Sequence, residues 1–350
     1  MNSKEDMSGK LLLDEPATGA DPRVSRRDLL RWASVIGVGG LGAGLIGCSD
    51  PPQQTINSGV TQPTTLEAGG IVNGVVTGLF NRVGVRNAKV EVVGVGTVKA
   101  DFAGAFSIRI ELPGDYTLIV SASDFVTRRT AMRITGNSTF AMTLMEDDEG
   151  LGVSFLNQYA RGTGPTSGPP PRTPGQTNRW ARGPRVLIYR RVAGDPSTVV
   201  PSAQIDRIIN VVNSTYGQFT AGALGFSPMI EQVDSEPPAS PAQIPVGAIG
   251  FYQTSDGSRG GGTSGAISDP FEAASGYAFT GIDAPVALLN RVFGQSLGAT
   301  IVDNSMTSVM NPGGQSSFGE KDSQASTVLY NRPAGSRAPD VDPERYFINL

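Results

Sequence analysis

Short runs of alternating apolar and polar residues occupy the chain from residue 71 to residue 146. Turn-forming residues separate these runs. Alternation of this kind is typical of half-buried strands, because successive side chains point to opposite faces. Strands at this spacing predict a small antiparallel, all-β sandwich. The expected strands are Ile71–Gly78, Lys89–Val93, Ala105–Ile110, Tyr116–Ala122, Thr127–Ile134 and Thr139–Met145.

A second region, residues 185–331, mixes strand and helix patterns. Apolar residues recur at three- and four-residue spacing after Ser202, a suitable N-cap, and predict an amphipathic helix. Another helix is expected to begin near Asp283-Ala284-Pro285. The segment Gln253–Gly276 is mostly Gly, Ser, Thr and Asp and is expected to form a long loop. With strands expected at Arg185–Val192, Met229–Val233 and Val246–Tyr252, the region is predicted to be an α+β domain.

The remaining segments lack such a pattern. Residues 49–70 are rich in Pro, Gln, Thr, Ser and Gly, so we expect a flexible stalk. Residues 147–184 contain Pro169-Pro170-Pro171 and are expected to form an extended Pro/Gly-rich linker. The Pro- and Asp-rich residues 332–350 are expected to lie as an extended tail over the surface.

The composition excludes several kinds of chemistry. The chain has no histidine and one cysteine, Cys48. It therefore cannot build a His-ligated zinc site, a Ser–His or Cys–His nucleophile, or an intrachain disulfide. The formal net charge of −4 gives no basic footprint for nucleic acid. We expect no cofactor.

The first 48 residues match an export signal. Ser25-Arg26-Arg27-Asp28-Leu29-Leu30-Arg31 resembles the twin-arginine pattern, with Arg26 and Arg27 as its arginine pair. A Gly-rich apolar stretch follows and closes with Leu45-Ile46-Gly47-Cys48, which resembles a lipobox. The resemblance implies an exported lipoprotein, anchored by acylated Cys48 in the periplasm or at the cell surface, with the outer membrane favoured where one exists. A plain N-terminal anchor helix is the alternative.

Two motifs in the predicted sandwich resemble the carboxypeptidase regulatory-like domain. Residues 101–106 read D-F-A-G-A-F, similar to its D-x-x-G-x-F signature. Residues 112–122 read L-P-G-D-Y-T-L-I-V-S-A and match the P-G-x-Y-x-L-x-V-x-A strand that follows it. The resemblance implies a transthyretin-like sandwich at residues 71–146 that acts as a spacer or adhesion module.

Residues 291–301 resemble the zinc-binding helix of the metzincin proteases, H-E-x-x-H-x-x-G-x-x-H. They read R-V-F-G-Q-S-L-G-A-T-I, so that the family's usual G, L and G are kept. In this register Arg291, Gln295 and Ile301 replace the three histidines, and Val292 replaces the catalytic glutamate. These positions form the vacated zinc site, where we expect no metal ligand and no catalytic residue.

Two later segments extend this resemblance. Ser308-Val309-Met310-Asn311-Pro312 is similar to the family's Met-turn, with Met310 as its methionine. Lys321-Asp322-Ser323, followed by Val328-Leu329-Tyr330, is similar to the last helix of matrixins. Together they imply a degenerate metzincin-like domain at residues 185–331 that kept the scaffold and lost the metal.

The resemblance implies a lipid-anchored pseudoenzyme that binds a protein or peptide partner along an edge strand beside the cleft. One alternative is an enzyme with a non-standard carboxylate metal site or with an unrecognised hydrolase activity. Separately, Asp256, Asp269 and Glu272 of the Gly/Asp-rich loop are candidate calcium ligands. Another is a purely structural envelope scaffold. Arg291 also has two interpretations: a surface arginine, or a cation that fills the vacated pocket and pairs with Asp303.

Overall fold

The computed structural model describes residues 69–147, 151–162, 175–255, 260–266, 272–313, 317–344 and 346–349. All of them belong to one compact unit, residues 64–350. Arg26, Arg27 and Cys48 of the predicted export signal lie outside the described residues, as does nearly all of the predicted stalk. Among the helices in the described ranges, none is long and apolar enough to cross a bilayer.

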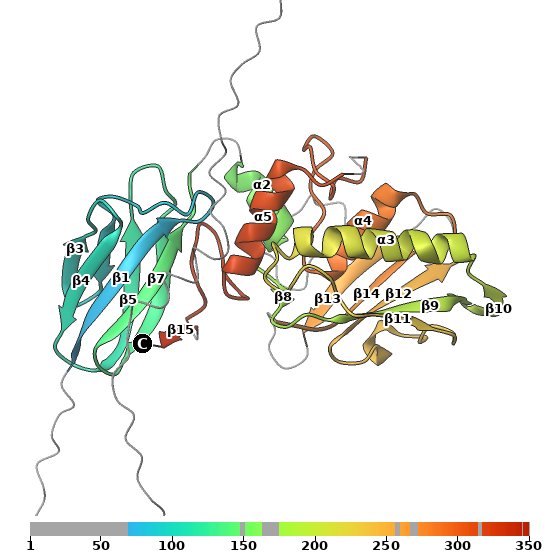
Figure 1. Cartoon of the computed structure of the whole chain (residues 1–350), viewed down its shortest axis with the longest axis horizontal. Coiled ribbons are helices and arrows are strands. Elements are labelled where there is room, and N and C mark those ends of the chain that lie inside the picture. The colour runs from blue at the N-terminus through green and yellow to red at the C-terminus, as the bar shows by residue number, and fades with distance from the viewer. Residues whose placement is uncertain are drawn as a thin grey trace, which may run out of the picture. The chain divides into compact units, whose positions relative to one another are not determined.

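The N-terminal part of the described chain is a β-sandwich (Figure 1). Its described strands form one sheet with the order β4-β1-β7 and another with the order β15-β6-β5-β2-β3. Every second residue of β4 is buried, because Phe106, Ile108 and Ile110 on the apolar side of the alternation face a shared core. The strands are β1 (Gly70–Gly78), β2 (Lys89–Val92), β3 (Gly96–Lys99), β4 (Ala105–Ile110), β5 (Gly114–Ser121), β6 (Arg128–Ile134), β7 (Ser138–Leu144) and β15 (Phe347–Asn349).

The predicted sandwich is confirmed, with two differences. It is mixed rather than purely antiparallel, because β7 runs parallel to β1 and β15 runs parallel to β6. It also contains two strands that were not predicted. β3 has only four residues, mostly exposed, and shows no apolar alternation. β15 comes from the far end of the chain, so no local pattern connects it with the sandwich.

Residues 179–331 contain a second sheet covered by helices. Its described strands have the path β10-β9-β12-β14-β13, with β11 beside β9 and β8 beside β14. The strands β11, β9, β12 and β14 pair parallel in that order, whereas the end strands β10 and β13 pair antiparallel with β9 and β14. The strands are β8 (Arg179–Trp180), β9 (Arg185–Ala193), β10 (Asp195–Val199), β11 (Ile230–Val233), β12 (Ala248–Thr254), β13 (Gly261–Ala266) and β14 (Glu272–Gly281).

The predicted long loop at Gln253–Gly276 is wrong for β13 and for the first half of β14. Small residues in these strands give no alternation of large apolar and polar side chains. The strands are instead specified by the ladder between them, from Gly261 opposite Phe279 to Ala266 opposite Ala273. Tertiary pairing therefore overrides weak local propensity here.

Helices α3 (Ser202–Phe219) and α4 (Val286–Ser296) lie across one face of this sheet (Figure 1), and α5 (Glu320–Asn331) contacts α3. The buried stripe of α3 includes Ile205, Ile208 and Val212 at the expected helical spacing. These side chains share a core with Val186 and Phe251 of the sheet. Pro201, rather than the predicted Ser202, is the N-cap of α3.

The segment predicted to be an extended linker contains a buried helix, α2 (Val153–Arg161). Phe155, Tyr159 and Trp180 all join the core of the second sheet and its helices. Trp180 also donates a hydrogen bond from Nε1 to the carbonyl oxygen of Ser296 (2.8 Å). The sequence did not predict this helix, because it has only nine residues and lies beside the Pro-rich residues 163–174.

The C-terminal residues do not all lie over the surface as predicted, although residues 337–339 are exposed. Ser336, Asp340 and Asp342 are buried, and Arg332 is 1% exposed. Their burial is possible because arginine and aspartate side chains pair with one another. Composition alone suggested a solvated tail, since these residue types are usually exposed when unpaired.

Candidate functional site

Helix α4 begins after Pro285 and carries Arg291, Val292 and Gln295, three of the four positions predicted to form a vacated zinc site; the fourth, Ile301, follows the helix. Gly294 allows a close approach on its buried side: a Cβ there would lie 2.5 Å from the ring of Phe219 and 2.9 Å from Sδ of Met310. Met310 is fully buried. The methionine of the predicted Met-turn therefore packs directly against α4.

The vacated positions do not share one environment. Arg291 and Gln295 are half-buried, whereas Val292 is fully buried in the core and Ile301 is half-buried. Nη1 of Arg291 donates to the carbonyl oxygen of Pro312 (2.9 Å), two residues after Met310. Gln295 lies beside the edge strand, because a Cβ on Gly262 of β13 would be 3.1 Å from its Cβ. Arg291 and Gln295 thus link α4 with the Met310 turn and with β13.

Asp322 of α5 holds the Met310 turn in place through hydrogen bonds. Its carboxylate accepts hydrogen bonds from the Ser308 hydroxyl, from the backbone N–H of Val309 (3.2 Å) and from that of Gly319 (2.9 Å). The Ser308 hydroxyl oxygen in turn accepts from the Met310 N–H (3.0 Å). The sequence placed Asp322 near the start of the last helix, and the contacts explain why a carboxylate is useful there.

Burial raises the pKa of Asp322 above its ordinary value, although its hydrogen bonds oppose the shift. A raised folded-state pKa means that Asp322 contributes stability below the ordinary aspartate pKa and loses it as the pH rises through the folded value. We therefore expect wild-type protein to lose stability relative to Asp322→Asn as the pH is raised above about 4. Urea unfolding of both proteins across that range measures the difference. A constant difference, or one of opposite sign, would contradict the assignment.

Asp303 does not pair with Arg291, so the second interpretation of that arginine is not supported by its contacts. Gln158 of α2 holds Asp303 instead: its Nε2 donates to the carboxylate (2.8 Å), and its Oε1 accepts from the Asp303 N–H (2.8 Å). The N–H of Thr300 donates to the Tyr159 carbonyl oxygen (2.8 Å). Helix α2, which the sequence analysis missed, therefore supports the segment that follows α4.

The described residues give no other candidate centre beside α4. Within them, no group of three or more His, Cys, Asp or Glu side chains could hold a metal ion. Asp256 and Asp269 of the candidate calcium set lie outside the described residues, and Glu272 is exposed at the start of β14. Two hollows, of about 380 and 350 Å³, lie beside Arg185 at the start of β9, and no residue of α4 lines either of them.

The sequence matches no protein-family model and no curated protein. Solved structures match only parts of it. A type II cohesin–X-dockerin complex from Acetivibrio cellulolyticus is 21% identical over 22% of this chain and 57% of its own, with a TM-score of 0.20. A 3-chlorocatechol 1,2-dioxygenase from Rhodococcus opacus 1CP is 8% identical over 23% of this chain and 60% of its own (TM-score 0.20).

A third solved structure, a DUF3823 family protein from Bacteroides uniformis, is 12% identical over 22% of this chain and 43% of its own, with a TM-score of 0.18. The chain thus spans less than two thirds of each of these proteins. Likenesses this partial carry no inference about activity, substrate or partner.

Proposed function

We propose that residues 185–331 form a degenerate metzincin-like domain that binds an extended peptide along β13 and does not hydrolyse it. The order of elements supports this proposal. β9, the short strand β10 and helix α3 come first. The parallel strands β11 and β12, the antiparallel edge strand β13 and β14 follow, and then come α4, the Met310 turn and α5. Residues 291–301 and 308–312 resemble the zinc-binding helix and the Met-turn of metzincins, and this resemblance implies the same order of elements.

The proposal of peptide binding rests on one observation, the position of β13. It ends the path of described strands, so one of its edges has no strand partner among them. An extended peptide can add a strand to such an edge through main-chain hydrogen bonds, and this needs no metal ion. Gly262 places β13 against the main chain of α4 at Val292 and beside Gln295. A peptide on β13 would therefore pass near the vacated positions.

The side chains at those positions can bind but cannot catalyse metal-dependent hydrolysis. Arginine only donates hydrogen bonds and stays protonated, so Arg291 cannot serve as a metal ligand. Val292 has no group that accepts a proton, and it is buried in the core. Arg291 can instead attract a carboxylate, so acidic peptides are the favoured ligands.

A binding experiment tests the edge-strand proposal. Peptides of about ten residues with acidic side chains would be screened against the purified protein, and the best binder would be N-methylated at single positions. Because alternate N–H groups of a bound strand face β13, we expect methylation to abolish binding at every second position only. Uniform tolerance of methylation, or no binder at all, would leave the structural scaffold as the better interpretation.

Arg291 should contribute to that affinity. We expect Arg291→Gln to weaken the acidic peptide about tenfold, because a hydrogen bond to a charged group is lost. Lys321→Gln is the matched control, since it removes the same charge from an exposed position of α5. Equal losses in the two variants would indicate a general charge effect and would argue against a site at α4.

Zinc content tests the pseudoenzyme proposal separately. Purified protein should contain no stoichiometric zinc and should cleave no peptide, because no imidazole is available. Combining Arg291→His, Gln295→His and Ile301→His should introduce zinc binding if these positions converge. Val292→Glu is omitted because it would place a carboxylate in the core. Stoichiometric zinc in the unmutated protein would overturn the proposal.

We also propose that acylated Cys48 anchors the protein outside the cytoplasm. The supporting residues are the Arg26-Arg27 pair and the lipobox-like end of the apolar stretch. Cys48→Ala should lose acyl label and membrane retention, and replacing both arginines with lysine should block export. Retention of Cys48→Ala in membranes would instead favour an uncleaved anchor helix.

A further inference from the structure

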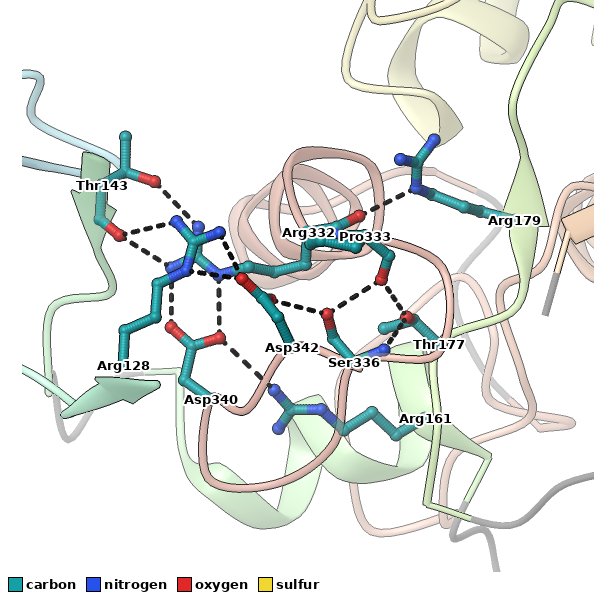
Figure 2. Close-up of polar contacts among 10 residues, drawn as sticks. All are labelled: Arg128, Thr143, Arg161, Thr177, Arg179, Arg332, Pro333, Ser336, Asp340 and Asp342. Carbon is teal, nitrogen blue, oxygen red and sulfur yellow. Dashed lines mark hydrogen bonds and ion pairs between the residues drawn. The ribbon is translucent and has the colours of Figure 1, made fainter. Parts of the chain in front are cut away.

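The C-terminal segment, residues 332–349, runs from α5 to the β-sandwich. Arg332, at the end of α5, donates to both carboxylate oxygens of Asp340 from Nε and Nη2 (2.8 and 2.7 Å). The same guanidinium donates to Oγ1 and the carbonyl oxygen of Thr143 in β7 (2.8 and 3.2 Å). One side chain therefore joins α5, the C-terminal segment and the sandwich (Figure 2).

A second arginine makes a parallel connection from the sandwich side. Arg128, the first residue of β6, donates from Nε and Nη2 to Oδ2 of Asp342 (3.3 and 2.8 Å). The other oxygen of Asp342 accepts from the Ser336 hydroxyl (3.0 Å). Arg161, at the end of α2, lies 4.0 Å from Asp340. Figure 2 shows how these side chains converge from β6, β7, α2 and the C-terminal segment.

Burial makes this network different from a surface ion-pair cluster. The side chains of Arg161, Arg332 and both aspartates are 0% exposed, and that of Arg128 is 8% exposed. A buried charge that loses its partner is strongly unfavourable, because it has neither water nor a counter-charge. The arrangement is therefore favourable only while the sandwich, α5 and the C-terminal segment are held together.

The main chain reinforces the same junction. Arg129 of β6 donates to the Asp340 carbonyl oxygen (3.0 Å) and accepts from the Asp342 N–H (2.9 Å). Farther along, β15 pairs with β6 from Phe347 opposite Ala131 to Asn349 opposite Arg133. Ile348 packs against the sandwich core. The segment thus supplies both a strand and the partners of two buried arginines.

We infer that residues 332–349 form an interlock that makes the sandwich and the α5-bearing part orient and unfold as one body. The buried network of Arg128, Arg332, Asp340 and Asp342 holds this interlock closed. It works independently of peptide binding at β13. The sandwich is then not a freely pivoting spacer, and side chains of residues 332–342 fix its position relative to the rest.

A cleavable form of the full chain tests the interlock. A specific protease site would replace residues 148–150, between β7 and α2, and the folded protein would be cut there. We expect the sandwich fragment to stay bound to the remainder in size-exclusion chromatography at micromolar concentration. Separation of the two fragments of the otherwise unmutated protein would overturn the inference.

Single substitutions then show whether the buried network is what keeps the two fragments together. Asp342→Asn should raise the Kd between the fragments roughly 30-fold or more, because Arg128 is left buried with a neutral partner. Arg133→Met is the matched control: it lies in the same strand, but its pair with Asp115 is half-exposed, so we expect less than a fivefold change. Equal effects of the two substitutions would contradict the inference.

A double substitution distinguishes loss of charge pairing from misfolding. Arg128→Met with Asp342→Leu removes both charges. The Kd between the two fragments of this double variant should therefore be lower than that of Asp342→Asn alone. Circular dichroism of the uncut proteins would confirm that the sandwich is folded in each variant. A double variant that is no better than Asp342→Asn would show that charge pairing is not what holds the parts together.

Discussion

Replacing Arg332 with methionine should destabilise the protein by about 3–5 kcal/mol, because Asp340 would stay buried without its bidentate partner. The variant also removes both hydrogen bonds to Thr143. Methionine roughly keeps the apolar volume of the arginine stem, so the loss reports the charge and not a large cavity. The free energy of unfolding from urea titration measures it.

Two comparisons make this prediction specific. Arg133→Met removes an ion pair that is about half-exposed, and we expect a change of about 1 kcal/mol or less. Arg332→Met combined with Asp340→Leu should recover much of the lost stability, since no unpaired charge is left. If the double variant is as unstable as the single one, the contacts with Thr143 would be the main contribution instead.

A second large effect is expected at Gly298, which follows α4. Its φ of +104° is disfavoured for residues with a side chain, and a Cβ there would meet the carbonyl oxygen of Asn178. Because that obstacle is backbone, it cannot rotate away as a side chain could. We expect Gly298→Ala to destabilise the protein by about 3 kcal/mol or more.

Gly313→Ala is the control for this prediction, because the nearest atom to its Cβ would be 3.7 Å away. We expect it to change the free energy of unfolding by about 0.5 kcal/mol or less. Thermal unfolding followed by circular dichroism distinguishes the two variants. A stable Gly298→Ala protein would mean that Asn178 and β8 can move away from α4, contrary to the packing around Trp180.

The β-sandwich could be predicted because its strands carry the signal locally. In β4 the apolar residues Phe106, Ile108 and Ile110 alternate with more polar or smaller ones, and the turn at Asp101 is set by its own carboxylate, which accepts from the N–H groups of Ala103 and Ala105 (both 2.8 Å). Helices α3 and α4 were predicted for the same reason: their apolar residues recur at helical spacing. Each of these elements is specified by its own residues.

The missed elements depend on partners that are distant in sequence. β13 is rich in glycine and becomes a strand through its ladder with β14. Asp340 and Asp342 are buried through arginines, one of which lies 214 residues away. At the vacated site the sequence identified the residues, but it did not show that Val292 faces the core or that Arg291 contacts Pro312.

The pairing of β15 with β6 also sets a condition on biosynthesis. A domain near the start of a chain usually folds as it emerges from the ribosome, before later residues are made. Here the sheet edge at β6 is covered by residues 347–349, which are translated after the whole of the second sheet. That edge and the Arg128 side chain therefore lack these partners until residues 340–349 have emerged. A nonsense mutation between α5 and Asp340 should consequently affect the sandwich, although all of β1–β7 would be translated.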